Sequence, residues 1–381
     1  MIKLLNIIGA RPQIIKAAAI SRAIREHFAA EVDEKILHTG QHYDKEMSAV
    51  FFEELGIPHP DYNLGVGSGT HGEQTSRIIA GIEQVLMDTH YDGVILYGDT
   101  NSTLAGAVAA SKLHIPIFHV EAGLRSFDMT MPEEINRIVC DHLSSILFAP
   151  TETACENLTR EGLASSPVSF ANGRHRSVIN SGDVMYDNSM YFAPLAEARS
   201  EIMRRYRLEK DEFILATVHR ANNTDDSFRL TSIFRALLDI AEQNDVKIVM
   251  PLHPRTAKLL SSRLEASIHT RLMQSKQVLL IPPASFYDIL VLEKNARMVM
   301  TDSGGVQKEA FFFERPSVIF RTETEWKEIV EYGAGFLADA DYDRIHEGYT
   351  RLSGHKVLFP RLFGDGKASS HILSEIIAYL R

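Results

Sequence analysis

Cysteine is scarce in this 381-residue sequence, which contains only Cys140 and Cys155. Neither lies at a spacing typical of metal ligands, so the composition argues against a disulfide framework and fits a reducing compartment. Long apolar runs are also lacking, since none approaches the roughly 20 residues that cross a bilayer. The apolar start at residues 2–8 is too short for a signal peptide and predicts a strand. We therefore expect a cytoplasmic protein without a membrane segment.

Positive charge is in short supply as well. The sequence has 40 Lys and Arg against 50 Asp and Glu, a net charge of −10. This balance argues against non-specific binding to nucleic acid or anionic lipid, although a local cationic cleft remains compatible with it. A Walker-type phosphate loop is missing, and no G-x-G-x-x-G follows the first predicted strand. Repeats of solenoid length and low-complexity tracts are absent too.

What the sequence does contain is typical of a soluble α/β protein, with 45% hydrophobic and 24% charged residues. Short runs rich in Ile, Val and Leu alternate with segments of helical period, which predicts doubly wound parallel sheets covered by helices. The predicted strands cover residues 3–8, 34–38, 93–97, 116–120, 146–149, 178–181, 213–217, 246–251, 278–281, 297–300 and 317–320. Helices are expected at 231–243 and 307–313.

The chain is longer than the roughly 250 to 300 residues at which a single core stops growing, so we expect two domains. We place a first Rossmann-like domain at residues 1–183 and a second at 184–366. Apolar residues at helical spacing predict a terminal helix at 367–381, which could pack back on the first domain. Sheets of this kind bind ligands outside the carboxyl ends of their strands, which favours a site between the two domains.

Polar residues follow the predicted strands of the first domain. After the first strand, Arg11 and Lys16 accompany a glycine and a proline at a helix start, a place that favours an anion. Asp99 and Glu121 follow two later strands, and Glu133 lies in the first turn of a helix that Pro132 opens. Each has a simpler explanation: a surface arginine, a helix cap, or an acid favoured by the helix dipole. Carboxylates gathered in one cleft would have their proton affinities pushed apart, as acid and base roles require.

The second domain repeats this arrangement with cations. His219 and Arg220 end one predicted strand and His253 ends another, although a lone histidine is often structural. The segment Ser303-Gly304-Gly305 stands at a helix start and is suited to a diphosphate. Glu309, one turn further on, could bind ribose hydroxyls. Together with Arg11, Arg220 and Arg321, these residues indicate binding of a nucleotide diphosphate with no metal or cofactor.

Several motifs resemble those of one known family. They are Gly9-Ala10-Arg11-Pro12, Gln41-His42, Gly98-Asp99-Thr100, His119-Val120-Glu121-Ala122-Gly123-Leu124-Arg125, Pro132-Glu133-Glu134-Ile135-Asn136-Arg137, His219-Arg220 and Thr301-Asp302-Ser303-Gly304-Gly305. The residues of these motifs, and the order in which the motifs follow one another, resemble those of the non-hydrolysing UDP-N-acetylglucosamine 2-epimerases over nearly the whole chain. The resemblance implies a GT-B-like fold with the active site in the cleft between two Rossmann-like domains. It also implies a homodimer that serves the synthesis of surface polysaccharide such as O-antigen.

The chemistry that the resemblance implies is inversion of C2 in a UDP-linked 2-acetamido sugar, by elimination of UDP to a glycal and re-addition. Asp99, Glu121 and Glu133 would handle the proton, and His219 would stabilise or protonate the diphosphate. The implied substrate contacts are Arg11, Lys16, Gln41, His42, Arg137, Arg220, His253, Ser303, Gly304, Gly305, Glu309 and Arg321. A GT-B glycosyltransferase or a non-catalytic UDP-sugar sensor could use the same diphosphate cradle, but the density of acids favours proton transfer.

Two departures from the family pattern bear on the substrate. Gln13 and Asn222 stand where many members carry Glu. Together with Thr324-Glu325-Trp326, they make the chain resemble the branch that acts on UDP-2,3-diacetamido-2,3-dideoxyglucuronate. Our hypothesis is that the neutral amides tolerate the C6 carboxylate of that sugar, because like charges repel in a desolvated cleft. Neutral drift would explain Asn222 equally well, and UDP-N-acetylglucosamine remains the alternative substrate.

Overall fold

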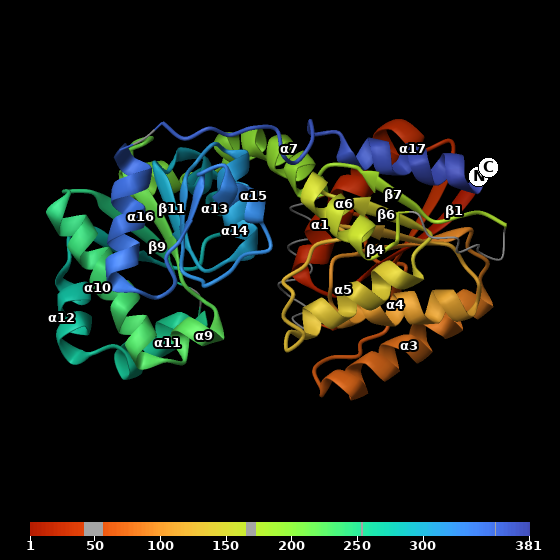
Figure 1. Cartoon of the computed structure of the whole chain (residues 1–381), viewed down its shortest axis with the longest axis horizontal. Coiled ribbons are helices and arrows are strands. Elements are labelled where there is room, and N and C mark those ends of the chain that lie inside the picture. Colours follow the sequence, from red (N-terminus) through yellow and green to blue (C-terminus); the bar gives the residue numbers. More distant parts are fainter. Residues whose placement is uncertain (42–55, 165–172, 253, 355) are drawn as a thin grey trace. The chain divides into compact units, whose positions relative to one another are not determined.

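The computed structural model describes residues 1–41, 56–164, 173–252, 254–354 and 356–381. The chain forms two compact units, one of Met1–Asn188 with Arg361–Arg381 and the other of Ser189–Pro360. Each unit is a parallel sheet accompanied by helices (Figure 1). The predicted class, two doubly wound parallel-sheet α/β domains, is confirmed.

The sheet of the first unit has seven strands in its described part, in the order β3-β2-β1-β4-β5-β6-β7. Every pair is parallel. The strands are β1 Ile2–Ile8, β2 Val32–His38, β3 Tyr62–Asn63, β4 Gly93–Tyr97, β5 Ile117–Val120, β6 Ile146–Ala149 and β7 Ser177–Asn180. All five residues of β4 are buried. Such a continuous apolar run is expected where both faces of a sheet are covered.

Helices lie on both faces of this sheet (Figure 1). They are α1 Arg11–Ala23, the π-helix η1 Ile24–Phe28, α3 His71–Asp88, α4 Asn101–Lys112, α5 Pro132–Leu143, α6 Glu152–Arg160, α7 Val184–Arg199, which runs into the second unit, and α17 Ala368–Leu380. The terminal helix α17 packs on α1. Its start is held by Asp187, whose carboxylate accepts hydrogen bonds from the backbone N–H groups of Ala368 and Ser369 at 3.0 and 2.7 Å. A carboxylate at that end also suits the helix dipole.

The second unit repeats the topology. Its described strands form a six-stranded parallel sheet in the order β10-β9-β8-β11-β12-β13. They are β8 Phe213–Thr217, β9 Lys247–Pro251, β10 Val278–Ile281, β11 Met298–Thr301, β12 Ser317–Ile319 and β13 Gly335–Leu337. The helices are α8 Ile202–Tyr206, α9 Ala221–Thr224, α10 Ser227–Gln243, α11 Pro254–Arg263, α12 Ala266–Gln274, α13 Phe286–Asn295, α14 Gly304–Phe312, α15 Lys327–Glu331 and α16 Tyr342–Gly354. None of the helices in the described ranges is long and apolar enough to cross a membrane.

Both sheets reverse their strand order at one point, between β1 and β4 in the first unit and between β8 and β11 in the second. Successive connections leave such a point in opposite directions, which opens a crevice at the carboxyl ends of the two strands. Each crevice is where the sequence places its polar residues: after β1, β4 and β5 in the first unit, and after β8, β11 and β12 in the second.

All eleven predicted strands are present. The strands β3 and β13, which have two and three residues, were not predicted. The expected helices at 231–243, 307–313 and 367–381 correspond to α10, α14 and α17. Two of them begin earlier than predicted. The helix α10 begins at Ser227, after its cap Asp226, and α14 begins at Gly304, because Ser303 caps it with a side-chain oxygen that accepts a hydrogen bond from Val306 N–H at 3.4 Å.

Candidate active site

The loop after β1 is braced by Gln13, which is only 1% exposed. Its side-chain oxygen accepts hydrogen bonds from the N–H groups of Gly9 at 2.8 Å and Ala10 at 3.1 Å. Its amide nitrogen donates to the carbonyl of Tyr97 at 2.9 Å and to the Thr103 hydroxyl at 3.0 Å. Gln13 thus joins the ends of β1 and β4, and both its amide oxygen and its amide nitrogen are engaged within the chain. The hypothesis that its neutral side chain tolerates a sugar carboxylate stays a prediction, which depends on the missing charge and not on a direct contact. Asn222, by contrast, is exposed on α9.

Lys16 and Glu121 form a buried ion pair at the carboxyl ends of β1 and β5, each with a side chain 9% exposed. Gly98, at the end of β4, lies against both: a Cβ added there would lie 3.2 Å from Lys16 Nζ and 3.4 Å from a Glu121 carboxylate oxygen. The backbone of Glu121 itself is left-handed, with φ of 69°. A non-glycine residue held in this region stores strain, a feature that clusters at functional sites.

The close approach at Gly98 leads to a prediction. Its φ of 62° disfavours any side chain. We expect Gly98→Ala to lower the free energy of unfolding by about 2 kcal/mol, from left-handed strain together with crowding against Lys16 and Glu121. Urea denaturation measures the loss. Gly162→Ala is the matched control, since Gly162 has φ of 77° but no neighbouring atom within 4 Å of an added Cβ. Equal losses in both variants would contradict the crowding.

Asp99 and Arg137 form a second pair beside the first. An Arg137 Nη2 contacts the Asp99 carboxylate, and Nη1 donates to Glu134 at 3.0 Å. The Nε of Arg137 is buried and has no hydrogen-bond partner among the described residues. Burial raises the pKa of Asp99 above its ordinary value. The positive charges of Arg137 and Lys16 lower this pKa only in part, and the negative charges of Glu121 and Glu133 raise it further.

The two glutamates at the start of α5 have different surroundings. Glu133 is exposed, whereas Glu134 is 1% exposed. The Glu134 carboxylate accepts hydrogen bonds from the N–H groups of Ser126 and Phe127, both at 3.0 Å, in addition to its pair with Arg137. Glu134 therefore holds the loop before α5 and orients Arg137. The sequence arguments did not select it, and helical periodicity alone could not, because Glu133 and Glu134 lie four and three residues before Arg137 and both share its face.

Gln41 braces the start of α4. Its side-chain oxygen accepts hydrogen bonds from Ser102 N–H at 3.0 Å and from the Ser102 hydroxyl at 2.6 Å. Arg11 is exposed at the first residue of α1. His42 and His253, both predicted to contact the ligand, lie outside the described residues. The structure thus brings together Lys16, Asp99, Glu121 and Arg137 at one edge of the first sheet.

In the second unit, Asp302 builds the loop that carries His219 and Arg220. Its carboxylate is fully buried and accepts hydrogen bonds from the backbone N–H of His219 at 3.1 Å and of Arg220 at 3.0 Å, and from the Asn223 side chain at 3.1 Å. It also lies 3.3 Å from His219 Nδ1. Sequence reasoning did not select Asp302. Its place directly after β11, inside a quoted motif, is the signal that could have identified it.

The predicted diphosphate cradle is a helix start, as expected. Ser303 caps α14, and Gly304 and Gly305 form its first two residues. A Cβ at Gly304 would lie 3.4 Å from a Glu325 carboxylate oxygen and 3.6 Å from Arg321 Nη1. Arg321 and Glu325 form a two-pronged pair with both contacts at 2.9 Å. Although burial opposes ionisation, Arg321 keeps the pKa of Glu325 below its ordinary value.

Glu309 lies in the second turn of the same helix. Its charge acts on the fully buried Glu293 of α13, whose pKa rises well above its ordinary value because of burial and the charge of Glu309. Glu309 is partly exposed and remains the candidate for ribose hydroxyls.

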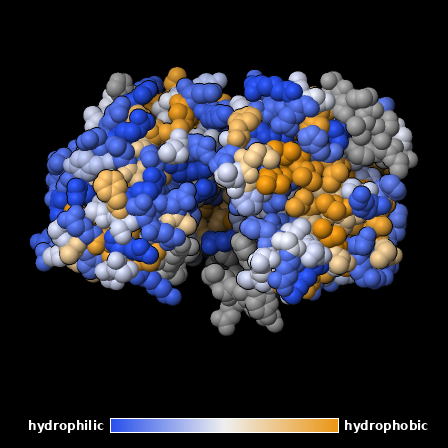
Figure 2. Space-filling view, turned by 60° about the horizontal axis from the view of Figure 1, so that its bottom comes forward, coloured by the Kyte–Doolittle hydropathy of each residue, from blue (hydrophilic) through white to orange (hydrophobic). Residues whose placement is uncertain are grey.

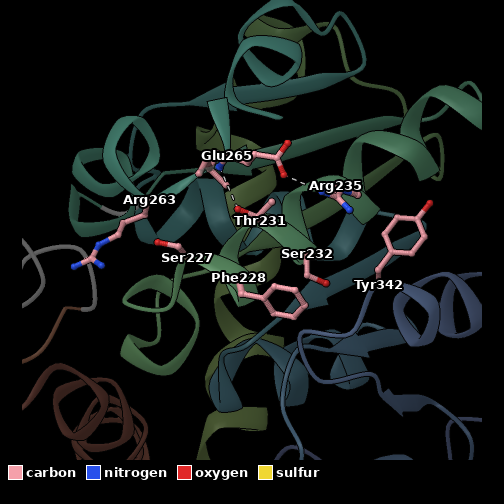
Figure 3. A pocket seen from close by; sticks show the side chains of 9 residues that line it. Ser227, Phe228, Thr231, Ser232, Arg235, Arg263, Glu265 and Tyr342 are labelled. Atoms are coloured by element: carbon pink, nitrogen blue, oxygen red, sulfur yellow. Dashed lines mark hydrogen bonds and ion pairs between the residues drawn. The ribbon is translucent and has the colours of Figure 1, made fainter. Parts of the chain in front are cut away.

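One pocket of the second unit, about 440 Å³ in volume, contains none of the predicted residues (Figure 3). It lies between α10, the segment joining α11 to α12, and the start of α16. Its lining residues are Ser227, Phe228, Thr231, Ser232, Arg235, Arg263, Leu264, Glu265 and Tyr342. Within the described part of the chain, no group of three or more His, Cys, Asp or Glu side chains could hold a metal ion.

The first unit carries carboxylates paired with cations, and the second carries a helix that begins with two glycines beside the loop of His219 and Arg220. Both units are doubly wound, and together these features define an α/β protein of the GT-B-like class. A family model described as UDP-N-acetylglucosamine 2-epimerase matches residues 23–377. The chain belongs to this family.

Individual relatives agree with this assignment. UDP-2,3-diacetamido-2,3-dideoxy-D-glucuronate 2-epimerase of Pseudomonas aeruginosa is 47% identical over 379 residues, which are 99% of this chain and 100% of the relative. The crystal structure of Methanocaldococcus jannaschii UDP-GlcNAc 2-epimerase in complex with UDP-GlcNAc and UDP is 41% identical, with a TM-score of 0.85 over 99% of this chain and 100% of that chain. Phytolacca americana UGT2, at 12% identity and a TM-score of 0.59 over the whole of both chains, shares the fold alone.

Proposed function

We propose that this protein is a non-hydrolysing 2-epimerase, an isomerase that inverts C2 of a UDP-linked 2-acetamido sugar. The observation that carries the proposal is the pairing of carboxylates with cations at the edge of the first sheet, where Glu121 contacts Lys16 and Asp99 contacts Arg137. Neighbouring carboxylates in such a cluster can divide the roles of base and acid. Membership of the epimerase family supports the same reaction.

The reaction has two steps. In the first, a carboxylate takes the C2 proton while the bond between C1 and the UDP oxygen breaks, leaving a glycal with a double bond between C1 and C2. In the second, the UDP oxygen bonds to C1 again and C2 receives a proton on its opposite face. A base and an acid must therefore stand on opposite faces of C2. We assign these roles to Asp99, Glu121 and Glu133 as a group.

The second unit is assigned to the departing UDP. Its negative charge increases as the C1–O bond breaks, and preorganised donors that face it lower the barrier. His219 and Arg220 supply side-chain donors, and Ser303, Gly304 and Gly305 supply the N–H groups of a helix start. The remaining proposed contacts are Arg11, Lys16, Gln41, His42, Arg137, His253, Glu309 for the ribose, and Arg321 for the nucleotide end.

We propose UDP-2,3-diacetamido-2,3-dideoxy-glucuronate as the substrate, to be converted to its mannuronate epimer. The support is the Pseudomonas aeruginosa relative named for this sugar. Gln13 adds no free amide group toward the sugar, because its amide is engaged within the loop, and its contribution is the absence of a negative charge. UDP-N-acetylglucosamine, which gives UDP-N-acetylmannosamine, is the alternative supported by the Methanocaldococcus jannaschii relative.

Incubation of each candidate UDP-sugar in D₂O, followed by proton NMR, tests the reaction. We expect deuterium to enter C2 and the epimer to accumulate without any acceptor, because re-protonation uses a solvent-derived proton. The values of kcat/KM for the two sugars decide the substrate, and a clear preference for UDP-N-acetylglucosamine would exclude the uronate. No exchange at C2, with sugar transfer only when an acceptor is added, would instead support a glycosyltransferase.

We also propose that the protein acts as a homodimer. The outer faces of α4 and α5 carry half-buried Leu104, Val108, Ile138 and Val139, and Ile135 beside them is 42% exposed. Figure 2 shows apolar side chains gathered on the face of the first unit that it draws. A contiguous apolar area of this kind is typical of a protein interface.

The cytoplasm is the proposed compartment. Cys140 and Cys155 are free thiols, which suits a reducing environment. A UDP-linked product of this type would supply mannosamine-type units for surface polysaccharide such as O-antigen.

A further inference from the structure

A chain of alternating charges runs through the first unit and ends at the carbonyl of Gly98. Glu161 accepts two hydrogen bonds from Arg125, both at 2.7 Å. Arg125 Nη1 lies 2.8 Å from Asp141, and the other oxygen of Asp141 lies 2.7 Å from His119 Nδ1. His119 Nε2 lies 2.8 Å from the Gly98 carbonyl oxygen. Arg125, Asp141 and His119 are at most 2% exposed.

The geometry requires both ring nitrogens of His119 to carry protons. A carbonyl oxygen can only accept, so Nε2 donates to Gly98. Asp141 also accepts hydrogen bonds from Gly123 N–H at 3.2 Å and from Arg125, which marks it as an ionised carboxylate, so Nδ1 donates to it. Burial opposes the positive charge of the ring, but Cys140 and Asp141 beside it outweigh this and raise the pKa of His119 to about 10.

The Gly98 carbonyl is a position that matters for the reaction. Gly98 lies against Lys16 and Glu121, and the following residue is Asp99. The Asp99 carbonyl is held separately by Asn136, whose amide donates to it at 2.9 Å. Two buried donors thus hold the two successive carbonyls of the Gly98–Asp99 turn. Of the two, His119 holds the carbonyl of Gly98, the residue whose Cα side lies against Lys16 and Glu121.

We propose that His119 is a positioning residue: a permanently protonated imidazolium, anchored by Asp141, that holds the Gly98 carbonyl and so fixes Asp99 relative to Glu121. This rests on the proposed epimerase reaction, in which those carboxylates handle the C2 proton. His119 itself does not touch the substrate. Its effect is on the placement of the reacting groups, and small displacements of such groups are costly.

Two substitutions separate the contacts of the ring. In His119→Gln the amide nitrogen can replace Nε2 and still donate to Gly98, whereas in His119→Asn it can replace Nδ1 and donate only to Asp141. We expect His119→Asn to lower kcat roughly 10- to 100-fold and His119→Gln only about threefold, with KM for the UDP-sugar little changed in both. Equal losses of kcat in the two variants, or a loss that appears mainly in KM, would overturn the proposal.

Two measurements do not depend on turnover. NMR with ¹⁵N-labelled histidine should show two ring N–H signals for His119 between pH 6 and 9, and a single one would overturn the proposal. Hydrogen exchange at residues 98–100 should increase in His119→Asn and stay near wild type in His119→Gln; an equal increase would contradict it. If wild-type protein gave no C2 exchange with either UDP-sugar, the proposed function would fail, while these two measurements would still decide the role of His119.

Discussion

Glu121→Gln should reduce kcat roughly 10²- to 10⁴-fold, the range that a proton-transfer group supplies. The amide keeps the size of the carboxylate but carries no charge, so it can neither take a proton nor neutralise Lys16. Lys16 would then remain as a buried cation with a weaker partner, since the pair is 9% exposed on both sides. Deuterium entry at C2, followed by NMR, measures the proton transfer directly.

The UDP affinity of the same variant provides its control. The diphosphate cradle and the proposed ribose and nucleotide contacts belong to the second unit, so we expect the Kd of UDP, measured by calorimetry, to stay within about threefold of wild type, which corresponds to less than about 0.7 kcal/mol. Glu156→Gln, on the exposed face of α6, is a matched substitution away from the site. Retention of more than a tenth of wild-type exchange in Glu121→Gln would show that Glu121 is not among the proton-handling groups. It would also leave Asp99 and Glu133 to share that role.

The strands were predictable from sequence because buried parallel strands are continuous apolar runs, as in β4. The same regularity located the site, since the carboxyl ends of such strands meet at one edge of the sheet. Lys16 and Glu121 are 105 residues apart in sequence, yet both were selected because each follows a strand. Strand ends can therefore be predicted from local pattern even where the contact itself is long-range.

Other features depended on contacts that no local pattern contains. Gln13 was interpreted as a substrate residue because only its type was known, whereas its role follows from acceptors and donors up to 90 residues away. Likewise, the pairing of His119 with Asp141 joins β5 to α5 and requires their packing. The choice between Glu133 and Glu134 is of the same kind, because both lie within one turn of Arg137 and only the contacts of the folded chain show that Glu134 is the buried partner.

Asp302→Ala should lower kcat/KM by about 10³-fold, although Asp302 is not expected to touch the substrate. The substitution leaves the N–H groups of His219 and Arg220 and the side chain of Asn223 without their acceptor. Losing hydrogen bonds to a buried carboxylate costs about 1.5–3 kcal/mol each, and two of them suffice for the expected change. His219 would then lose the orientation in which, by our proposal, it faces the departing UDP. Asp302→Asn is the matched comparison, because its remaining oxygen can still accept from the two backbone groups and should preserve more activity.

Hydrogen exchange at the amides of His219 and Arg220 reports the order of this loop directly and should increase more in the alanine variant. If Asp302→Ala showed wild-type kcat/KM together with fast exchange at these amides, the order of this loop would not be needed for the reaction.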